Sequence, residues 1–320
     1  MKRRLCSLLL LAAWTALLLG GCFGRPLGQP EKPAGGYEVK DSTGYVLRLP
    51  QKPQRIVSLS IGTDEILLAL VPAERIAALT YWVDDGGISN VTEEAKGVPG
   101  RVKASAETIL GLQPDLVIIP DWQPAELVQI LRDAGLAVYV YNGATTVEQI
   151  KQAIAGIARV VGEEAAGARV AAQMDSELAV IGETVRQIPA GERQVAVRFT
   201  LMGGSGGRGS TFDDICRYAG VENGAAMVGL DGDGSLSKEQ IIAINPDLLI
   251  MPTWDFSGQT DMQQFKKAVQ EDPALQPVKA VRQQRLIFIS DRYLYCSSQY
   301  IVQGVRALAE AAYPKYFGPP

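Results

Sequence analysis

Short glycine- and aspartate-rich stretches of this sequence have the spacing of chemically active sites. Residues 204–209 satisfy the GxGxxG pattern of a turn that cradles a dinucleotide. Residues 203–207 match the GxSxG turn that presents a nucleophilic serine. Asp231 and Asp233 resemble the start of a calcium-binding loop. The corresponding chemistries would be cofactor binding, acyl transfer and metal binding.

The rest of the sequence weighs against all three. No histidine occurs among the 320 residues, so the serine lacks a histidine base and imidazole-ligated zinc or haem sites are excluded. The twelfth position of the calcium pattern, where a ligating Glu belongs, is Ile242. We interpret the glycine run as a mobile loop and the aspartates as a solvated turn. Dinucleotide binding remains the weaker alternative, and no catalytic residue or metal site is expected.

Two tryptophans end two copies of one sequence pattern. Ser105–Trp122 and Ser237–Trp254 lie 132 residues apart and are identical at 9 of 18 positions. Each copy predicts a short amphipathic helix, a Pro-Asp turn and an apolar strand. Two copies are too few for a solenoid and indicate two similar α/β lobes. Because ligands of open α/β sheets bind beyond the carboxyl ends of the strands, Trp122 and Trp254 should face one cleft from opposite sides.

The elements around the two copies predict parallel sheets. A hairpin over 37–49 should open the first lobe, residues 37–145, and a helix over 299–312 should close the second, residues 189–320. Between them strands alternate with helices, which is typical of parallel sheets with helical crossovers. Further strands are expected over 55–60, 76–80, 137–141, 194–201 and 285–290, and further helices over 63–71, 124–135 and 211–219.

A long helix is expected between the lobes, over residues 146–188. This segment contains no proline. Its apolar residues recur with a helical period, at Val147, Ile150, Ile154, Ile157 and Val161. We predict one long helix, kinked near Gly162, rather than a coiled coil, because the apolar stripe is not a sustained heptad.

The N-terminus has the pattern of an export signal. The basic residues Lys2–Arg4 precede an apolar stretch over 8–19, which is too short to span a bilayer. Gly20 and Gly21 then precede Cys22, which resembles the lipobox of bacterial lipoproteins. We expect a signal peptide over 1–21, acylation of Cys22 and a flexible Gly- and Pro-rich tether over 22–36.

Composition bounds the mature chain. Removal of the signal peptide leaves 299 residues, enough for two domains, and takes the formal charge from −4 to −7. An acidic chain without a basic run argues against nucleic-acid binding. Cys216 and Cys296 are the cysteines that remain free of the signal and the lipid. They could form a disulfide outside the cytoplasm, but the sequence does not show their proximity.

The chain also resembles a known family. The motifs that carry the resemblance are the lipobox, RIVSLSIGTDEILLALV, KASAETILGLQPDLVIIP, a long helix, GRGSTFDDICRYAGVEN, LSKEQIIAINPDLLIMP and DPALQPVKAVRQQRLIFIS. They are similar to the periplasmic binding proteins of ABC importers for iron-siderophores, haem and cobalamin, over nearly all of residues 37–316. The resemblance implies two Rossmann-like α/β lobes with central parallel sheets, joined by one long helix, with the ligand cleft between them. It also implies a monomer without enzymatic activity or cofactor.

The resemblance implies partners as well. In this family a Glu in the first turn of the repeated helix of each lobe docks onto arginines of the permease, which works with an ATPase. The matching residues here are Glu107 and Glu239. The alternative is that both carboxylates only complement the dipoles of their helices.

For the ligand, the resemblance implies a cleft of aromatic and arginine side chains. The candidates are Tyr81, Trp82, Trp122, Arg198, Trp254, Arg292, Tyr293 and Tyr295. Tyr81 matches a binding tyrosine of the cobalamin-binding member, whereas Arg101 and Asp233 replace its tryptophans. Tyr81 is also the candidate axial ligand for haem. Arginines and indole faces suit large anionic ferric siderophores.

We therefore expect an extracytoplasmic, lipid-anchored protein that captures a ferric siderophore and delivers it to a permease, with cobalamin or haem as alternative ligands. An enzyme or an adhesin on the same fold and a zinc or manganese carrier are the rivals. The absence of histidine and of a carboxylate cluster weighs against the enzyme and the metal carrier. A ligand screen would identify the adhesin.

Cys22→Ser should release the protein from the membrane or leave it uncleaved, because acylation requires the thiol. Fractionation after detergent-free lysis measures this, with Cys6→Ser as the matched control inside the signal peptide. A cleaved Cys22→Ser protein that still sediments with the membrane would contradict the lipobox interpretation.

Overall fold

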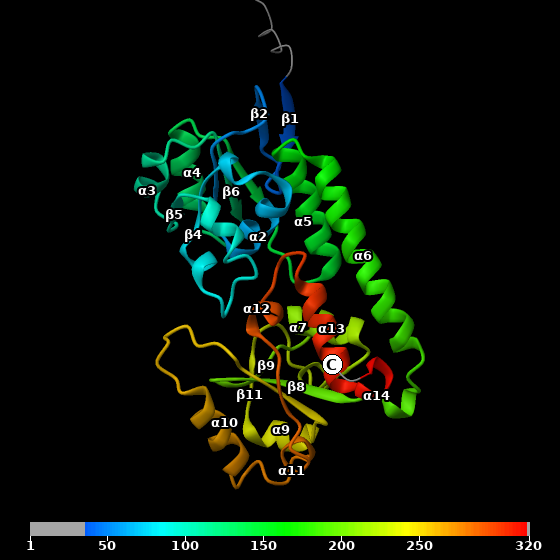
Figure 1. The fold of residues 1–320 in the computed structure, drawn as a ribbon. Helices are drawn as coiled ribbons and strands as arrows, with labels where there is room; N and C mark the ends of the chain where they lie inside the picture. Colours follow the sequence, from blue (N-terminus) through cyan, green and yellow to red (C-terminus); the bar gives the residue numbers. More distant parts are fainter. Residues whose placement is uncertain (1–35, 319–320) are drawn as a thin grey trace, which may run out of the picture. The chain divides into compact units, whose positions relative to one another are not determined.

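The computed structural model describes residues 36–318, which form two α/β regions connected by helices (Figure 1). The expected signal peptide, Cys22 and nearly all of the tether lie outside the described residues. Residues from Tyr37 onward cluster into one compact unit. Within the described range, no helix combines the length and the hydropathy that crossing a bilayer requires.

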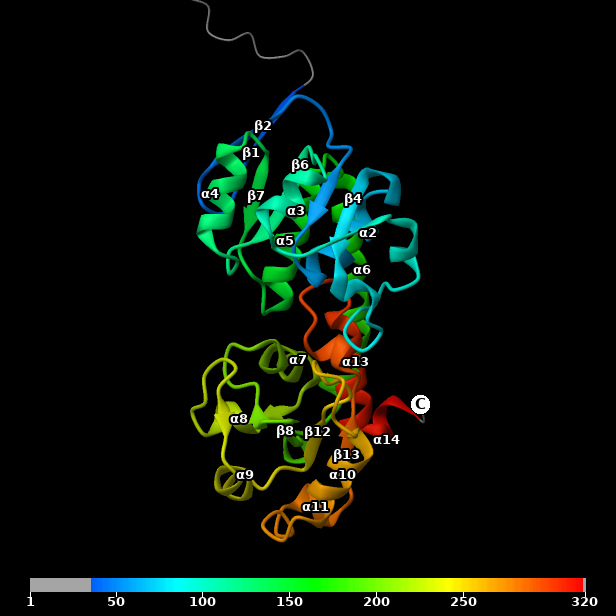
Figure 2. The ribbon, with the colours of Figure 1, turned by 90° about the vertical axis from the view of Figure 1, so that its left-hand side faces the viewer.

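The first sheet consists, in the described residues, of five parallel strands (Figure 2). Their spatial order is β5 (Gly100–Val102), β4 (Ile76–Thr80), β3 (Ile56–Ser58), β6 (Leu116–Pro120) and β7 (Val138–Tyr141). The central strands β3 and β6 are buried along their whole length because both faces of the sheet are covered. In β6, Leu116 and Ile118 pack on the face covered by α2 (Ile61–Leu70) and α5 (Val147–Val160). Val117 and Ile119 pack on the other face, covered by α3 (Ala106–Gly111) and α4 (Ala125–Asp133).

The second sheet has a parallel centre and an antiparallel edge. Its order is β11 (Ser235–Leu236), β9 (Gly203–Ser205), β8 (Val195–Thr200), β12 (Leu248–Met251) and β13 (Leu286–Phe288), with β10 (Glu222–Asn223) also paired to β8. Strands β8, β12, β13 and β10 are parallel, while β9 and β11 are antiparallel to their neighbours. The two mainly parallel sheets confirm the predicted fold class.

Helices cover the sheets, and several begin at polar caps. The Ser60 hydroxyl accepts a hydrogen bond from the backbone N–H of Thr63 at the start of α2, and Ser210 does the same for Asp213 at the start of α7. The α-helices are α2 (Ile61–Leu70), α3 (Ala106–Gly111), α4 (Ala125–Asp133), α5 (Val147–Val160), α6 (Glu164–Arg186), α7 (Thr211–Ala219), α8 (Gly224–Met227), α9 (Lys238–Ile244), α10 (Met262–Glu271), α11 (Lys279–Arg282), α12 (Asp291–Leu294), α13 (Ile301–Ala312) and α14 (Pro314–Phe317). Short 3₁₀ turns are η1 (Ala73–Arg75), η2 (Tyr81–Asp84), η3 (Glu94–Gly97) and η4 (Ala190–Glu192).

The repeated sequence forms the same unit twice, α3–β6 and α9–β12. Ile109 and Ile241 occupy matching positions and are fully buried. The repeated Asp has the same role in both copies. Asp115 accepts the backbone N–H of Arg55, at 2.8 Å, and Asp247 accepts that of Val195, at 2.7 Å. Each Pro-Asp turn therefore ties the start of β6 or β12 to the start of the neighbouring central strand.

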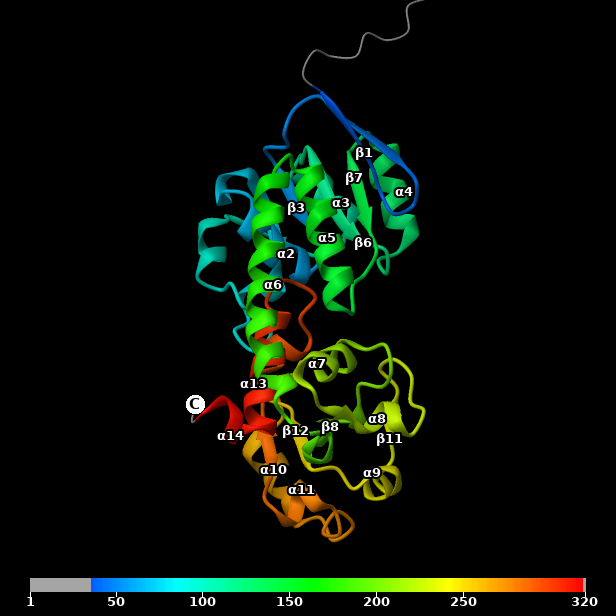
Figure 3. The same ribbon diagram turned by 90° about the vertical axis from the view of Figure 1, so that its right-hand side faces the viewer.

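The predicted single helix over 146–188 is wrong. Two helices, α5 and α6, run side by side and antiparallel, as the Lys151–Asp175 ion pair at 2.8 Å shows (Figure 3). The turn between them contains Gly162, whose φ of +75° favours glycine. The apolar period continued through this turn because both helices bury one face. Only α6, with 23 residues, is the long connecting helix.

The glycine run also differs from the expected mobile loop. Gly203–Ser205 is strand β9, paired antiparallel with Thr200–Arg198 on one side and with β11 on the other. Gly207 lies where a Cβ would be 2.2 Å from the carbonyl oxygen of Leu230, so close packing explains this glycine without a nucleotide. The expected positive φ is present at Gly206 and Gly209.

The expected hairpin β1 (Tyr37–Lys40) and β2 (Val46–Leu49) covers the free edge of β7. Asp41, whose side chain is fully buried, accepts hydrogen bonds from Tyr45 N at 3.0 Å, Val140 N at 3.3 Å and Arg132 Nη2 at 2.5 Å. The Arg132 guanidinium stacks 3.9 Å above the Tyr45 ring. This carboxylate therefore fixes the hairpin to the sheet.

Asp41→Ala should lower the free energy of unfolding by about 3–5 kcal/mol, because it leaves Arg132 as a buried, unpaired charge. Urea denaturation measures the loss. Glu38→Ala in the same hairpin is the control: it removes only an exposed pair with Arg48 and should cost about 0–1 kcal/mol. Equal losses in the two variants would contradict this role of Asp41.

Candidate functional site

A cavity of about 570 Å³ lies at the carboxyl edge of the first sheet. Each strand of that sheet delivers a lining residue just after it ends: Ser60, Tyr81, Lys103, Trp122 and Gly143 come after β3, β4, β5, β6 and β7. The segment between α12 and α13 adds Tyr295 and Ser297 from the second half of the chain. The cavity thus occupies the place where open α/β sheets bind ligands.

The eight predicted ligand residues divide into two groups. Tyr81, Trp82, Trp122 and Tyr295 line the cavity, and Trp122 is the most accessible of them, with 65% of its surface exposed. Arg198, Trp254, Arg292 and Tyr293 are not among the lining residues. Trp122 and Trp254 were expected to face one cleft; Trp122 lines this cavity and Trp254 does not. Whether each residue contacts ligand stays a prediction.

Arg198 lies just behind the cavity wall. It is 4% exposed, and its guanidinium stacks 3.8 Å from the ring centre of the lining residue Tyr295. Its Nη2 is 3.8 Å from Asp291 Oδ1, too far for a hydrogen bond, and has no hydrogen-bond partner among the described residues. A buried donor left unpaired is costly. The geometry therefore suits donation to an anionic group that approaches along Tyr295.

Asp291 uses its other oxygen for the backbone. Oδ2 accepts hydrogen bonds from Thr253 N at 2.7 Å and Trp254 N at 3.0 Å. This carboxylate ties the end of β12 to the start of α12. Because Oδ2 binds these two N–H groups and Oδ1 stays 3.8 Å from Arg198 Nη2, the Asp291 carboxylate neutralises the charge of Arg198 only in part.

The remaining predicted residues pack within the protein. The Trp254 indole donates a hydrogen bond to Asp85 Oδ2 at 2.8 Å, and its ring meets the edge of Trp82 at a centroid distance of 6.1 Å. The Arg292 guanidinium lies 5.0 Å from the ring centre of Tyr293, which packs against the main hydrophobic core.

Lys103 is a cation of the cavity wall, at the end of β5, that was not predicted from the sequence. The Lys103 ammonium lies 5.4 Å from the ring centre of Tyr81, whose ring is in turn 4.3 Å from that of Trp82. Lys103 directly follows β5. The same carboxyl-end rule that selected Trp122 would have selected it, had the short strand β5 been recognised.

The cavity wall near β7 and α2 is polar but uncharged. The Tyr141 hydroxyl lies 3.0 Å from Ser60 Oγ and 2.9 Å from Thr63 Oγ1, within hydrogen-bond distance of both. Burial raises the pKa of Tyr141, so the phenol stays protonated.

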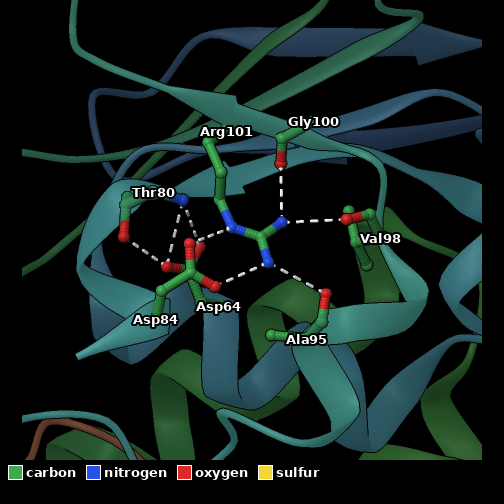
Figure 4. A network of polar contacts seen from close by, with 7 residues as sticks. All are labelled: Asp64, Thr80, Asp84, Ala95, Val98, Gly100 and Arg101. Carbon is green, nitrogen blue, oxygen red and sulfur yellow. Dashed lines mark hydrogen bonds and ion pairs between the residues drawn. The ribbon is translucent and has the colours of Figure 1, made fainter. Parts of the chain in front are cut away.

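Arg101 binds Asp84 of η2, the turn that carries Tyr81 and Trp82; Figure 4 shows the contacts of its guanidinium. All five of its N–H donors are occupied by the Asp84 carboxylate, at 2.7 Å from Nε and Nη2, and by three carbonyl groups. Hydrogen bonds from Arg101 lower the pKa of Asp84. Arg101 therefore buttresses η2 and has no donor left for a ligand. Asp233, the other position compared with a tryptophan, is exposed in the turn before β11.

Asp64 of α2 fixes the start of the same turn by binding Thr80, the residue before η2 (Figure 4). Its carboxylate is fully buried and accepts the backbone N–H of Thr80, at 3.1 Å, and the Thr80 hydroxyl. Burial raises the pKa of Asp64 well above its ordinary value, although the hydrogen bonds from Ser58 and Thr80 oppose the shift. Arg101 and Asp64 together give the aromatic pair a rigid base.

Glu107 and Glu239 are exposed in the first turns of α3 and α9. A hydrogen bond from Ser237 lowers the pKa of Glu239, so this carboxylate is charged at neutral pH. Both are free to meet a cationic surface.

The cysteines and aspartates form neither a disulfide nor a metal cluster within residues 36–318. Cys216 and Cys296 are buried free thiols, and burial raises the pKa of both. The expected solvated turn at Asp231 is exposed, with Arg208 3.7 Å away. No group of three or more potential metal-ligating residues gathers anywhere in the described range.

A second cavity of about 590 Å³ lies beside α7. Two of the arginines that line it are engaged: Arg217 pairs with Asp214 at 2.6 Å, and Arg193 donates to the carbonyl of Gly220 at 2.9 Å. The third, Arg208, is exposed and lies 3.7 Å from Asp231. This cavity holds none of the predicted ligand residues.

The sequence is similar to a known protein family and to curated proteins. The profile of the family described as periplasmic binding protein matches residues 56–293. An uncharacterised ABC transporter substrate-binding lipoprotein of Bacillus subtilis, YvrC, is 25% identical, with 99% of each chain covered. A cobalamin-binding protein of Halobacterium salinarum is 26% identical over 66% of this chain and 57% of its own length.

Solved structures agree with this fold. The periplasmic heme-binding protein RhuT from Roseiflexus in its apo form is 28% identical, covering 81% of this chain and 99% of its own, with a TM-score of 0.69. The molybdate-binding protein MolA of Haemophilus influenzae shares the fold at 18% identity and a TM-score of 0.72, covering 88% and 92%. The profile match over most of the chain, the full-length relative and the two-sheet architecture together show that the chain belongs to the periplasmic binding protein family, as the substrate-binding component of an ABC importer and not as an enzyme.

Proposed function

We propose that this substrate-binding protein, lipid-anchored through Cys22 outside the cytoplasm, captures an anionic ferric siderophore in the 570 Å³ cavity and delivers it to the permease. The observation that carries the proposal is the Arg198 guanidinium. It is nearly fully buried, stacked on the lining residue Tyr295, and its Nη2 lacks a partner among the described residues. An anionic group of the ligand would supply the missing acceptor.

The charge and the aromatic content of the wall support the same ligand class. Lys103 lines the cavity, and none of the described lining residues is acidic. Tyr81, Trp82 and Trp122 offer exposed or half-buried ring faces on which planar catecholate rings can stack. A neutral cobalamin would use the rings but would supply no anionic group for Lys103 or for Nη2 of Arg198.

Haem is the second candidate, favoured by one specific observation. Tyr81 is 42% exposed at the cavity wall, with the Lys103 ammonium 5.4 Å from its ring. A tyrosine oxygen is a suitable axial ligand for ferric haem. The heme-binding name of the Roseiflexus relative supports this alternative, and the cobalamin-binding name of the Halobacterium relative supports the third.

Titration of the mature protein, followed by quenching of tryptophan fluorescence, tests the function. We expect a ferric triscatecholate siderophore to bind tightly. Arg198→Gln should weaken this binding about 10- to 100-fold, the loss expected for one hydrogen bond to a charged group. Arg208→Gln, which removes an exposed arginine of the second half of the chain, should bind like the wild type.

Other ligands provide the contradicting outcomes. Binding of cyanocobalamin without any response to the ferric siderophore would overturn the proposal in favour of cobalamin. A Soret band that forms with hemin and is lost in Tyr81→Phe would favour haem. Thermal melting of Arg198→Gln checks that lost affinity does not come from unfolding around Asp291.

Delivery to the permease should depend on the two exposed glutamates. Glu107→Arg combined with Glu239→Arg should keep ligand affinity but stop uptake, because reversed surface charges impair association with a basic partner. Uptake of radiolabelled ferric siderophore by cells that lack other carriers measures this. Glu126→Arg combined with Glu271→Arg reverses two other exposed carboxylates and should leave uptake unchanged. Normal uptake by the 107/239 double variant would reduce both residues to helix-dipole partners.

A further inference from the structure

The turn that carries the aromatic wall is held from two sides. In η2 and the residue after it, neighbouring carboxylates face different partners. Asp84 pairs with Arg101 of the first sheet, at 2.7 Å, whereas Asp85 Oδ2 accepts the Trp254 indole N–H, at 2.8 Å. Trp254 follows β12 of the second sheet, 169 residues away in sequence. The same short turn also presents Tyr81 and Trp82 to the cavity.

The indole of Trp254 is seated on a glycine. A Cβ at Gly87 would lie 2.2 Å from Trp254 Cδ1 and 3.0 Å from Cγ, so only glycine leaves room for this ring. Gly87 N also donates to the second oxygen of Asp85, at 2.9 Å, which orients the carboxylate. We term the group formed by Asp85, Gly87 and Trp254 the clasp.

The clasp is fixed at its other end as well. The backbone N–H of Trp254 donates to Asp291 Oδ2, so this tryptophan cannot follow the turn without moving the end of β12. Its ring contacts Trp82 edge-on, at 6.1 Å and 78°, and Phe256 at 6.3 Å and 86°. Phe256 lies 5.3 Å from Trp82 and closes this aromatic cluster.

We propose that Trp254 is a positioning residue: through Asp85 and Gly87 it clasps the second half of the chain to η2 and holds the Trp82 ring against the cavity. Trp82 lines the cavity and Trp254 does not, so Trp254 supports the wall through Trp82. The indole N–H is already donated to Asp85 and is not offered to a ligand. The effect on ligand binding rests on the proposed function, whereas the clasp itself can be observed in the free protein.

Two adjacent glycines provide a matched test. Gly87→Ala drives a methyl group into the indole, whereas Gly86→Ala places the same methyl where no heavy atom lies within 4 Å. Neither glycine has a positive φ, so both backbones accept alanine. In ¹⁵N–¹H spectra of the free mature protein, Gly87→Ala should shift the indole signals of Trp254 and Trp82, and Gly86→Ala should leave them unchanged. Trp254→Phe and Trp82→Phe assign these signals.

A rescue experiment separates positioning from stability. Asp85→Asn keeps one of the two acceptor oxygens, which serves the indole N–H or Gly87 N but not both, and should shift the signals less than Asp85→Ala, which should act as Gly87→Ala does. Affinity for a ferric triscatecholate should fall about 3- to 10-fold in Gly87→Ala and Asp85→Ala, fall less in Asp85→Asn and stay near wild type in Gly86→Ala. Thermal melting should differ little between the asparagine and alanine variants of Asp85.

The outcomes are decisive in either direction. An unshifted Trp82 signal in Gly87→Ala would overturn the proposal, as would shifted signals accompanied by unchanged affinity in a wild type that binds the probe. If the wild type does not bind the ferric triscatecholate, the proposed function fails, while the indole signals of the free protein still decide whether the clasp holds Trp82.

Discussion

The buried carboxylate of Glu65 is the interaction on which the cavity depends. Located on α2, it accepts hydrogen bonds from Asn90 N at 2.8 Å, Asn90 Nδ2 at 2.9 Å and the Ser298 hydroxyl. Asn90 Nδ2 also donates to the carbonyl of Arg292, and Gln299 Nε2 donates to the carbonyl of Glu65. The segment that carries Tyr295 is thereby fixed to the helix beside the first sheet. Burial raises the pKa of Glu65, and these donors offset part of that penalty.

Parallel strands impose the second constraint, because their carboxyl ends meet at one edge of the sheet. The repeated Pro-Asp turns maintain that geometry. Asp115 and Asp247 bind backbone N–H groups at the opposite, amino ends of β3 and β8, and so set the strand alignment without approaching the cavity. The repeat is therefore a structural unit, and its two tryptophans, Trp122 and Trp254, lie just beyond the carboxyl ends of β6 and β12.

The residues beyond the two strands have different roles because their surroundings differ. Trp122 lines the cavity with 65% of its surface exposed, whereas Trp254 is half-buried and hydrogen-bonded to Asp85. The two arginines differ in the same way. All five N–H donors of Arg101 bind acceptors near its own strand. Arg198, stacked on Tyr295, has one nitrogen, Nη2, that finds no hydrogen-bond partner among the described residues. Residue type alone does not separate a support from a binding group, since both use the same donors and rings.

The sequence by itself determined the alternating elements, the two-sheet fold and the strand ends at which Trp122 would lie, because apolar periodicity, caps and the Pro-Asp turns act over a few residues. Tertiary structure decided the rest. The segment with one continuous apolar period forms two helices because the chain turns at Gly162. Strand β5 has only three residues and was not predicted, so Lys103 was not recognised as a residue at a strand end. Arg101 forms an ion pair with Asp84, and the Trp254 indole donates a hydrogen bond to Asp85, 169 residues away in sequence. Side-chain partners of this kind are set by which distant segments pack together, and local periodicity carries no information about that choice.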